Sequence, residues 1–116
     1  MHCQCEKGPI KRLTIEGDIG ADPVWCSDCG CNLELEDFPF PADLAAKLEA
    51  WVQTYGEWMD WETERLKPGG LEMEAAFNAK GQALTEQAAE QLAGYTITFS
   101  PSTSASEYDK LDNQQE

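Results

Sequence analysis

The sequence predicts an α+β fold: a small zinc-ribbon-like β region, then two or three helices, then a C-terminal strand that joins the sheet. Three observations predict it. Apolar and polar residues alternate near both ends, apolar residues recur at helical spacing in the middle, and five cysteines lie in the first 31 residues. A chain of 116 residues suits one domain with a modest core. We expect that domain over residues 1–104, with residues 105–116 as a polar, mobile tail.

The zinc-ribbon-like β region is expected over about residues 1–36. Leu13 and Ile15 alternate with polar neighbours, as in a half-buried strand. Glycines, an aspartate and a proline in residues 17–23 then predict a turn or loop. Two further short strands are expected on either side of the cysteine turn, in VWC and CNLELE.

The helical part is expected over about residues 41–93. Pro41 suits the first turn of a helix, which should run to about residue 55 or on to 61. Its apolar face is formed by side chains at offsets of three, four and seven: Leu44, Leu48, Trp51, Val52 and Tyr55.

A second helix is expected from about residue 71 to 93, after the connection LKPGG. Gly81 lies on its apolar seam, where a close approach of another helix would suit a glycine. Alternatively, Thr85 caps a new helix and divides this segment in two. The alternating YTITF at residues 95–99 predicts the C-terminal strand.

The cysteines fall into two groups. In WCSDCGC, Cys26 and Cys29 have the C-x-x-C-G spacing of a zinc knuckle, where a tight turn aims two thiolates at one ion. Cys3 and Cys5 can supply the other pair, and the residues between Cys5 and Cys26 leave room for a hairpin. We therefore predict one structural Zn²⁺ held by Cys3, Cys5, Cys26 and Cys29.

Two other ligand candidates and three rival chemistries stay open. Cys31 can replace Cys29 or Cys5, or be a small buried side chain, and His2 is the weaker alternative. A redox dithiol is one rival, but the βαβ pattern that usually surrounds it is absent from the sequence. Iron–sulfur ligation is the second, but the cysteine spacings match no ferredoxin sequence. A catalytic zinc would need an open coordination position and a nearby general base. A closed structural site is the simplest interpretation.

The chain is strongly acidic, with a formal net charge of −14. Residues 32–64 hold nine acidic side chains against one basic one, a net of −8. This charge disfavours nucleic acid as a partner, with Lys7, Lys11 and Arg12 as a possible local exception. It favours a basic protein partner, although acidity can also serve solubility alone.

Three of the four tryptophans lie in WVQTYGEWMDWETE, residues 51–64. Trp51, Tyr55 and Trp58 share one helical face, which predicts core contacts. Trp58 and Trp61 do not fit that stripe together, so one of them is expected at the surface among carboxylates. An exposed tryptophan surrounded by carboxylates suits the binding of a basic protein. The predicted partner-binding residues are Trp58, Asp60, Trp61, Glu62 and Glu64.

These features predict a non-enzymatic zinc-binding protein, an adaptor or inhibitor with structural zinc that docks a basic protein. The alternatives are a small zinc metalloenzyme or thiol redox protein and, more weakly, a nucleic-acid-binding zinc ribbon. No catalytic residue is assigned, because His2 is the single histidine and no nucleophile motif accompanies it. The lack of a secretory leader and of an apolar run of about 20 residues predicts a cytoplasmic protein without membrane contact. The sequence leaves the oligomeric state open.

Three segments carry a family resemblance: WCSDCGCNLELEDFP, then W…YGEWMDWE, then FSPST. Together with the N-terminal C-x-C, they resemble a family of small uncharacterised Gram-positive bacterial proteins with a CxC…CxxCGC zinc-ribbon-like motif. The resemblance covers about residues 2–104. It supports all five cysteines as metal-ligand candidates, and it implies no catalytic activity.

Overall fold

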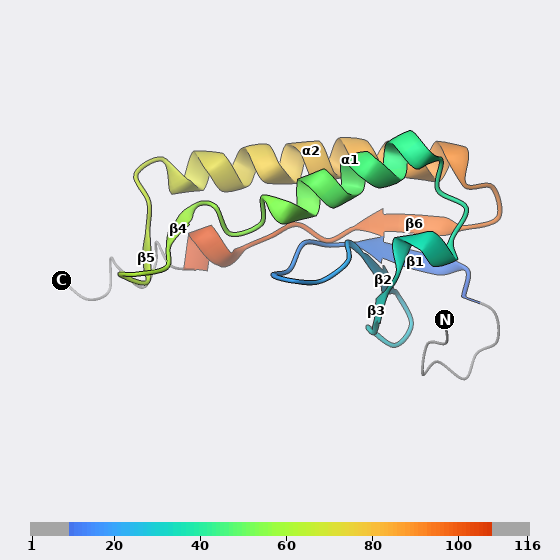
Figure 1. Cartoon of the computed structure of the whole chain (residues 1–116), viewed down its shortest axis with the longest axis horizontal. Coiled ribbons are helices and arrows are strands. Elements are labelled where there is room, and N and C mark those ends of the chain that lie inside the picture. Colours follow the sequence, from blue (N-terminus) through green and yellow to red (C-terminus); the bar gives the residue numbers. More distant parts are fainter. Residues whose placement is uncertain (1–9, 108–116) are drawn as a thin grey trace.

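The structure, a computed structural model, describes residues 10–107. Two helices lie along one side of a small mixed sheet (Figure 1). The predicted α+β class, with a C-terminal strand that joins the sheet, is confirmed. The sheet has the strand order β3-β2-β1-β6, and its strands are β1 (Arg12–Ile15), β2 (Val24–Cys26), β3 (Asn32–Leu33) and β6 (Thr96–Phe99).

β1 is a central strand of this sheet. It pairs antiparallel with β2, with Leu13 opposite Cys26 and Ile15 opposite Val24. On its other edge it pairs parallel with β6, where Leu13 lies opposite Ile97. A parallel neighbour needs a long crossover connection, and the helices supply it. All five of these side chains are buried, so they form the apolar face that packs against the rest of the core.

The first long helix, α1 (Ala42–Gln53), follows a short 3-10 helix, η1 (Leu35–Asp37). α1 buries Leu44, Leu48 and Trp51, the stripe that the helical spacing predicted. None of the helices within residues 10–107 combines the length and the apolar character needed to cross a membrane.

α1 ends earlier than predicted. The Thr54 hydroxyl donates a hydrogen bond to the Trp51 carbonyl at 2.7 Å. Gly56 then takes a φ of +86°, a conformation that glycine adopts without a steric cost and that turns the chain away. A small antiparallel hairpin follows, made of β4 (Met59–Asp60) and β5 (Arg65–Leu66), so the alternative of a helix that continues to residue 61 is wrong.

The second long helix, α2 (Gly70–Gln91), is continuous over 22 residues. A new helix start at Thr85 is therefore wrong, and the Thr85 hydroxyl instead donates to the Gly81 carbonyl at 2.8 Å within the helix. A Cβ atom on Gly81 would lie 2.5 Å from ring atoms of Trp51 and of Phe99. The absence of a side chain thus lets α2 approach α1 closely, as its place on the seam predicted, and it also lets α2 approach β6.

An aromatic cluster joins the helices at the centre of the core. Trp51 stacks on Phe77 with ring centroids 4.4 Å apart, and Phe99 lies 6.0 Å from Trp51. Trp58 and Tyr55 meet Phe77 edge-on at 5.2 and 5.8 Å. Offset-stacked and edge-to-face pairs add to the stability that burial alone provides.

The segment after β6 is fastened to α2 by a buried carboxylate. Glu74 is 4% exposed and accepts hydrogen bonds from the Ser102 hydroxyl at 2.7 Å and the Ala105 N–H at 2.9 Å. Residues 104–107 form a helical turn, and Ala105 is fully buried. Ala105 therefore packs against the core, the predicted domain bounds stay a prediction, and residues 108–116 of the predicted tail lie outside the described residues.

Candidate protein-interaction surface

The β4–β5 hairpin projects an exposed turn at one end of the molecule, where Figure 1 shows it below the start of α2. Asp60 Oδ1 accepts hydrogen bonds from the N–H groups of Glu62, at 3.0 Å, and Thr63, at 3.4 Å. Glu64 takes a φ of 57°, and the chain then pairs back through Arg65 opposite Asp60. Asp60, predicted to contact a partner, therefore shapes the turn, whereas Glu62 and Glu64 are exposed.

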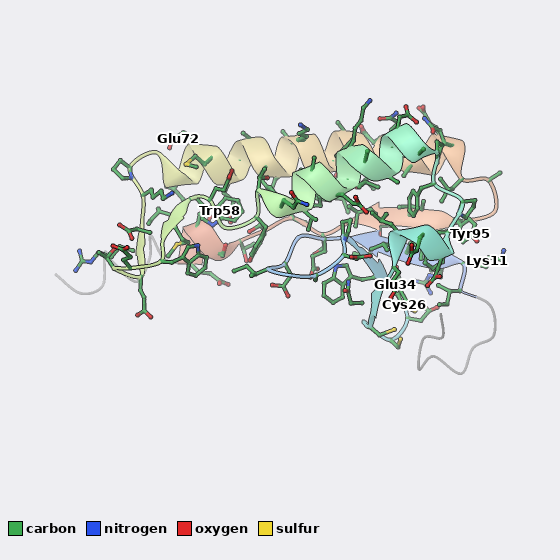
Figure 2. All side chains as sticks on the ribbon, viewed as in Figure 1. Lys11, Cys26, Glu34, Trp58, Glu72 and Tyr95 are labelled. Atoms are coloured by element: carbon green, nitrogen blue, oxygen red, sulfur yellow. The ribbon has the colours of Figure 1, made fainter. Side chains whose placement is uncertain are left out.

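The two tryptophans of this segment have opposite environments. Trp58, labelled in Figure 2, is 1% exposed. Its Nε1–H donates to Ser104 Oγ at 3.0 Å. Trp61 is 55% exposed. The prediction that one of the pair lies at the surface is met by Trp61, while Trp58 is a core residue and leaves the set of partner-binding candidates.

A large apolar side chain that the sequence analysis did not select also lies at the surface. Ile19, in the loop between β1 and β2, is 62% exposed. No periodic pattern surrounds it, so the sequence offered no signal that separates it from an ordinary loop residue. Its significance comes from the tertiary structure, because Gly56 brings it near Trp61.

The cysteine turn between β2 and β3 is tight. The Gly30 N–H donates to the Cys26 carbonyl at 2.8 Å, and the Cys26 N–H donates to the Cys31 carbonyl at 3.0 Å. Gly30 has a φ of +79°, which the C-x-x-C-G pattern anticipated. Cys26 is buried, Cys29 is exposed, and the Sγ atoms of Cys29 and Cys31 lie 3.4 Å apart.

The predicted metal site is only partly inside the structure. Cys3 and Cys5, and the weaker candidate His2, lie outside the described residues. Within residues 10–107, no group of three or more histidine, cysteine, aspartate or glutamate side chains is arranged to hold a metal ion. The zinc-ribbon character of the β region is therefore not supported, and the set of four cysteine ligands stays a prediction.

The two described basic side chains of the predicted local basic face have partners within the protein. Lys11 Nζ lies 4.8 Å from the centroid of the Tyr95 ring. Arg12 Nη1 lies 2.9 Å from Asp28 Oδ1, in an ion pair. Lys7 lies outside the described residues. This arrangement removes the support that these side chains gave to a nucleic-acid-binding alternative.

Glu34 lies in an acidic cluster between β3 and η1. A side-chain hydrogen bond with Glu36, desolvation, and the nearby charges of Asp37, Glu36 and Asp22 raise the pKa of Glu34 above its ordinary value of 4.5. A raised pKa means that the folded protein still holds a proton that the unfolded chain has released. Stability therefore falls as pH rises through the interval between the two pKa values.

Glu34→Gln is expected to raise the melting temperature at pH 7, because it removes an ionised carboxylate from this cluster. The gain should shrink below the ordinary pKa of glutamate, where the wild-type side chain is also neutral. Thermal unfolding of the wild type and of Glu34→Gln, at pH 7 and at a pH below the ordinary pKa of glutamate, measures the difference in melting temperature. Glu86→Gln, at an exposed position of α2, is the control, and an equal gain from both variants at pH 7 would contradict the assigned cause.

A model of the family described as Serratia CdiI immunity protein-like matches residues 11–102, which is most of the chain. No curated protein matches the sequence. The matched segment includes every described strand and long helix. Neither a zinc-ribbon motif nor a Gram-positive origin is part of this match, so the resemblance to a Gram-positive zinc-ribbon-like family is supported only at the level of a family of small proteins.

The predicted function, an adaptor or inhibitor with structural zinc that docks a basic protein, is corrected by the family match, while the Zn²⁺ ion itself stays a prediction. The family match points to a different role, and the described residues contain no group that could hold a metal. The family match agrees with one part of the prediction, a small protein with an interaction role. Because the family model covers residues 11–102, the chain belongs to the Serratia CdiI immunity protein-like family.

Proposed function

We propose that this protein is an immunity protein of contact-dependent inhibition that neutralises a protein toxin by binding to it. The observation that carries the proposal is the family match over residues 11–102. In this role the chain is non-enzymatic and acts in the cytoplasm, where it meets a toxin that has entered the cell. It needs a recognition surface, and it needs no catalytic group.

The charge of the chain indicates the chemistry of the toxin surface. A formal net charge of −14 would repel an acidic protein and attract a basic one. Electrostatic attraction of this kind accelerates encounter and disfavours wrong partners, and it weakens with salt because the screening length is about 8 Å at physiological ionic strength. A toxin that acts on nucleic acid would have such a basic surface.

The exposed turn of the β4–β5 hairpin supplies the binding residues in this proposal. Trp61 offers a large apolar side chain, and Glu62 and Glu64 lie beside it in the sequence and are exposed. Asp60 holds the turn through its bonds to two backbone N–H groups. A rigid turn that presents an aromatic residue among carboxylates loses little conformational entropy on binding.

The proposal predicts specific protection of growing cells. The tagged chain, used as bait in extracts of the organism that carries its gene, is expected to capture a toxin that can be identified by mass spectrometry. Expression of that toxin alone should stop growth of a test bacterium, and co-expression of the chain should restore growth. The physical reason is that a stoichiometric complex covers the toxin's functional surface.

The control is a variant of the chain that lacks a core side chain and does not fold, such as Leu48→Asp, because Leu48 is fully buried in α1. This variant has a more negative charge than the wild type, so protection by it would show that acidity alone is enough. Failure of the folded wild-type chain to capture or to neutralise any toxin would contradict the proposed function.

A further inference from the structure

Two exposed apolar side chains from distant parts of the sequence approach the same glycine. Ile19 is 62% exposed in the β1–β2 loop, and Trp61 is 55% exposed in the β4–β5 turn. A Cβ atom on Gly56 would lie 3.0 Å from Cζ2 of Trp61 and 3.9 Å from Cδ1 of Ile19. Ile19 and Trp61, which we call the apolar anchor, therefore lie on the same side of Gly56.

Close packing at Gly17 also holds the β1–β2 loop against the aromatic side chains of the core. A Cβ atom on Gly17 would lie 3.0 Å from Cδ1 of Tyr55 and 2.6 Å from Cζ of Phe77. The loop therefore packs against the end of the α1 segment at Gly17 and again at Gly56, and its position is set by the aromatic cluster of the core. The apolar anchor thus lies on a loop that packs against the core, although its two side chains are the most exposed large apolar groups of residues 10–107.

Both segments that carry the apolar anchor also carry exposed carboxylates. Asp18, whose Oδ1 accepts a hydrogen bond from the Ile19 N–H at 2.8 Å, comes from the loop. Glu57, Glu62 and Glu64 come from the segment that carries Trp61, and all three are exposed. Arg65 is the nearest basic residue along the sequence, and no ion pair joins it to these carboxylates among the described residues.

We infer that the apolar anchor is the centre of the toxin-binding surface, and that its occupant is an apolar side chain of the toxin flanked by lysine or arginine. This inference rests on the proposed function. The choice of occupant follows from charge complementarity, because the two segments that carry these apolar side chains also carry four exposed carboxylates, and Arg65 forms no ion pair with them within residues 10–107. Large apolar groups at the centre of a polar rim are the usual site of strong contacts in an interface.

Gly56 is a positioning residue in this surface. Its φ of +86° and the 3.0 Å approach of the Trp61 ring both exclude a side chain without local movement. Gly56→Ala is expected to displace the Trp61 ring and to weaken binding, although residue 56 itself contributes no side chain.

The test measures the dissociation constant between the purified chain and the toxin domain captured in the experiment above. Trp61→Ala is expected to raise Kd about 30-fold, the threshold for a strong contact, and Ile19→Ala about tenfold. The double variant should show less than the product of the two effects, because the two side chains share one contact region. Unchanged melting temperatures would show that the variants act on binding and not on the fold.

Matched controls come from α2. Leu71 is 40% exposed, so Leu71→Ala removes a comparable apolar side chain outside the anchor and should change Kd less than twofold. Replacement of Glu57, Glu62 and Glu64 by glutamine should slow association more than replacement of Glu72, Glu86 and Glu90, which are exposed on α2.

The outcomes separate this inference from the proposed function. If the wild-type chain binds the toxin and both anchor variants bind it equally well, the anchor is not the docking surface while the immunity role stands. If the wild-type chain forms a dimer that Trp61→Ala dissociates, a second copy covers the anchor and the inference is overturned. If no toxin is captured at all, the proposed function and the inference fail together.

Discussion

Trp51→Ala is expected to lower the free energy of unfolding by about 3–5 kcal/mol, the range for loss of a buried large aromatic side chain. Trp51 is 2% exposed and stacks on Phe77 at a centroid distance of 4.4 Å. Its Nε1–H donates to the Phe77 carbonyl at 2.8 Å, so it ties α1 to α2 by both packing and hydrogen bonding. The cavity left by alanine would lie between both helices and Phe99 of β6.

Denaturant unfolding measures this loss, and the chain offers a matched control. Trp61→Ala makes the same chemical change at a side chain that is 55% exposed, and it should alter the free energy of unfolding by less than about 1 kcal/mol. Trp51→Phe should fall between the two, because it keeps an aromatic ring and loses the hydrogen bond. Equal losses from Trp51→Ala and Trp61→Ala would contradict the core assignment.

Glu74→Ala is expected to destabilise the protein by about 1–3 kcal/mol, the cost of leaving a buried donor without an acceptor, because the buried Ala105 N–H and the part-buried Ser102 hydroxyl would both lose this carboxylate. The donors are the Ser102 hydroxyl, at 2.7 Å, and the Ala105 N–H, at 2.9 Å. Ser104 Oγ, which lies 3.5 Å from the same carboxylate oxygen, also accepts from Trp58. Loss of Glu74 would therefore release the segment after β6 and loosen the contact with Trp58.

Two measurements check this prediction. Denaturant unfolding gives the change in stability, and limited proteolysis reports whether cleavage moves to the segment around Ser102. Glu72→Ala is the control, since Glu72 lies on the exposed side of the same helix, as Figure 2 shows. Equally small losses of stability from Glu72→Ala and Glu74→Ala would show that Glu74 does not hold the segment after β6 in place.

The fold was predictable where a local pattern repeats. The alternation around Leu13 and Ile15 gave β1, and the alternation in residues 95–99 gave β6, because one face of each strand must be buried. The spacing of Leu44, Leu48 and Trp51 gave α1 for the corresponding reason. The β4–β5 hairpin was missed because its strands are two residues long and show no period.

The candidate surface was predictable only in part, because distant contacts decide which side chains are exposed. The sequence indicated that one of Trp58 and Trp61 lies outside, but it did not show that Trp58 packs against Phe77 and bonds to Ser104, 46 residues away. Ile19 and Trp61 both lie close to Gly56, an arrangement that no local pattern encodes. The cysteine spacing correctly indicated a tight turn, but a local turn does not establish a metal-dependent function.

Calorimetric titration tests whether this chain neutralises a toxin by binding to its basic surface, as we propose. The purified chain is added to the captured toxin domain at low and at high salt, and toxin activity is assayed in the same mixtures. We expect a one-to-one complex, loss of toxin activity at equivalence, and weaker binding at high salt. No binding, or a saturated complex in which the toxin remains fully active, would contradict it.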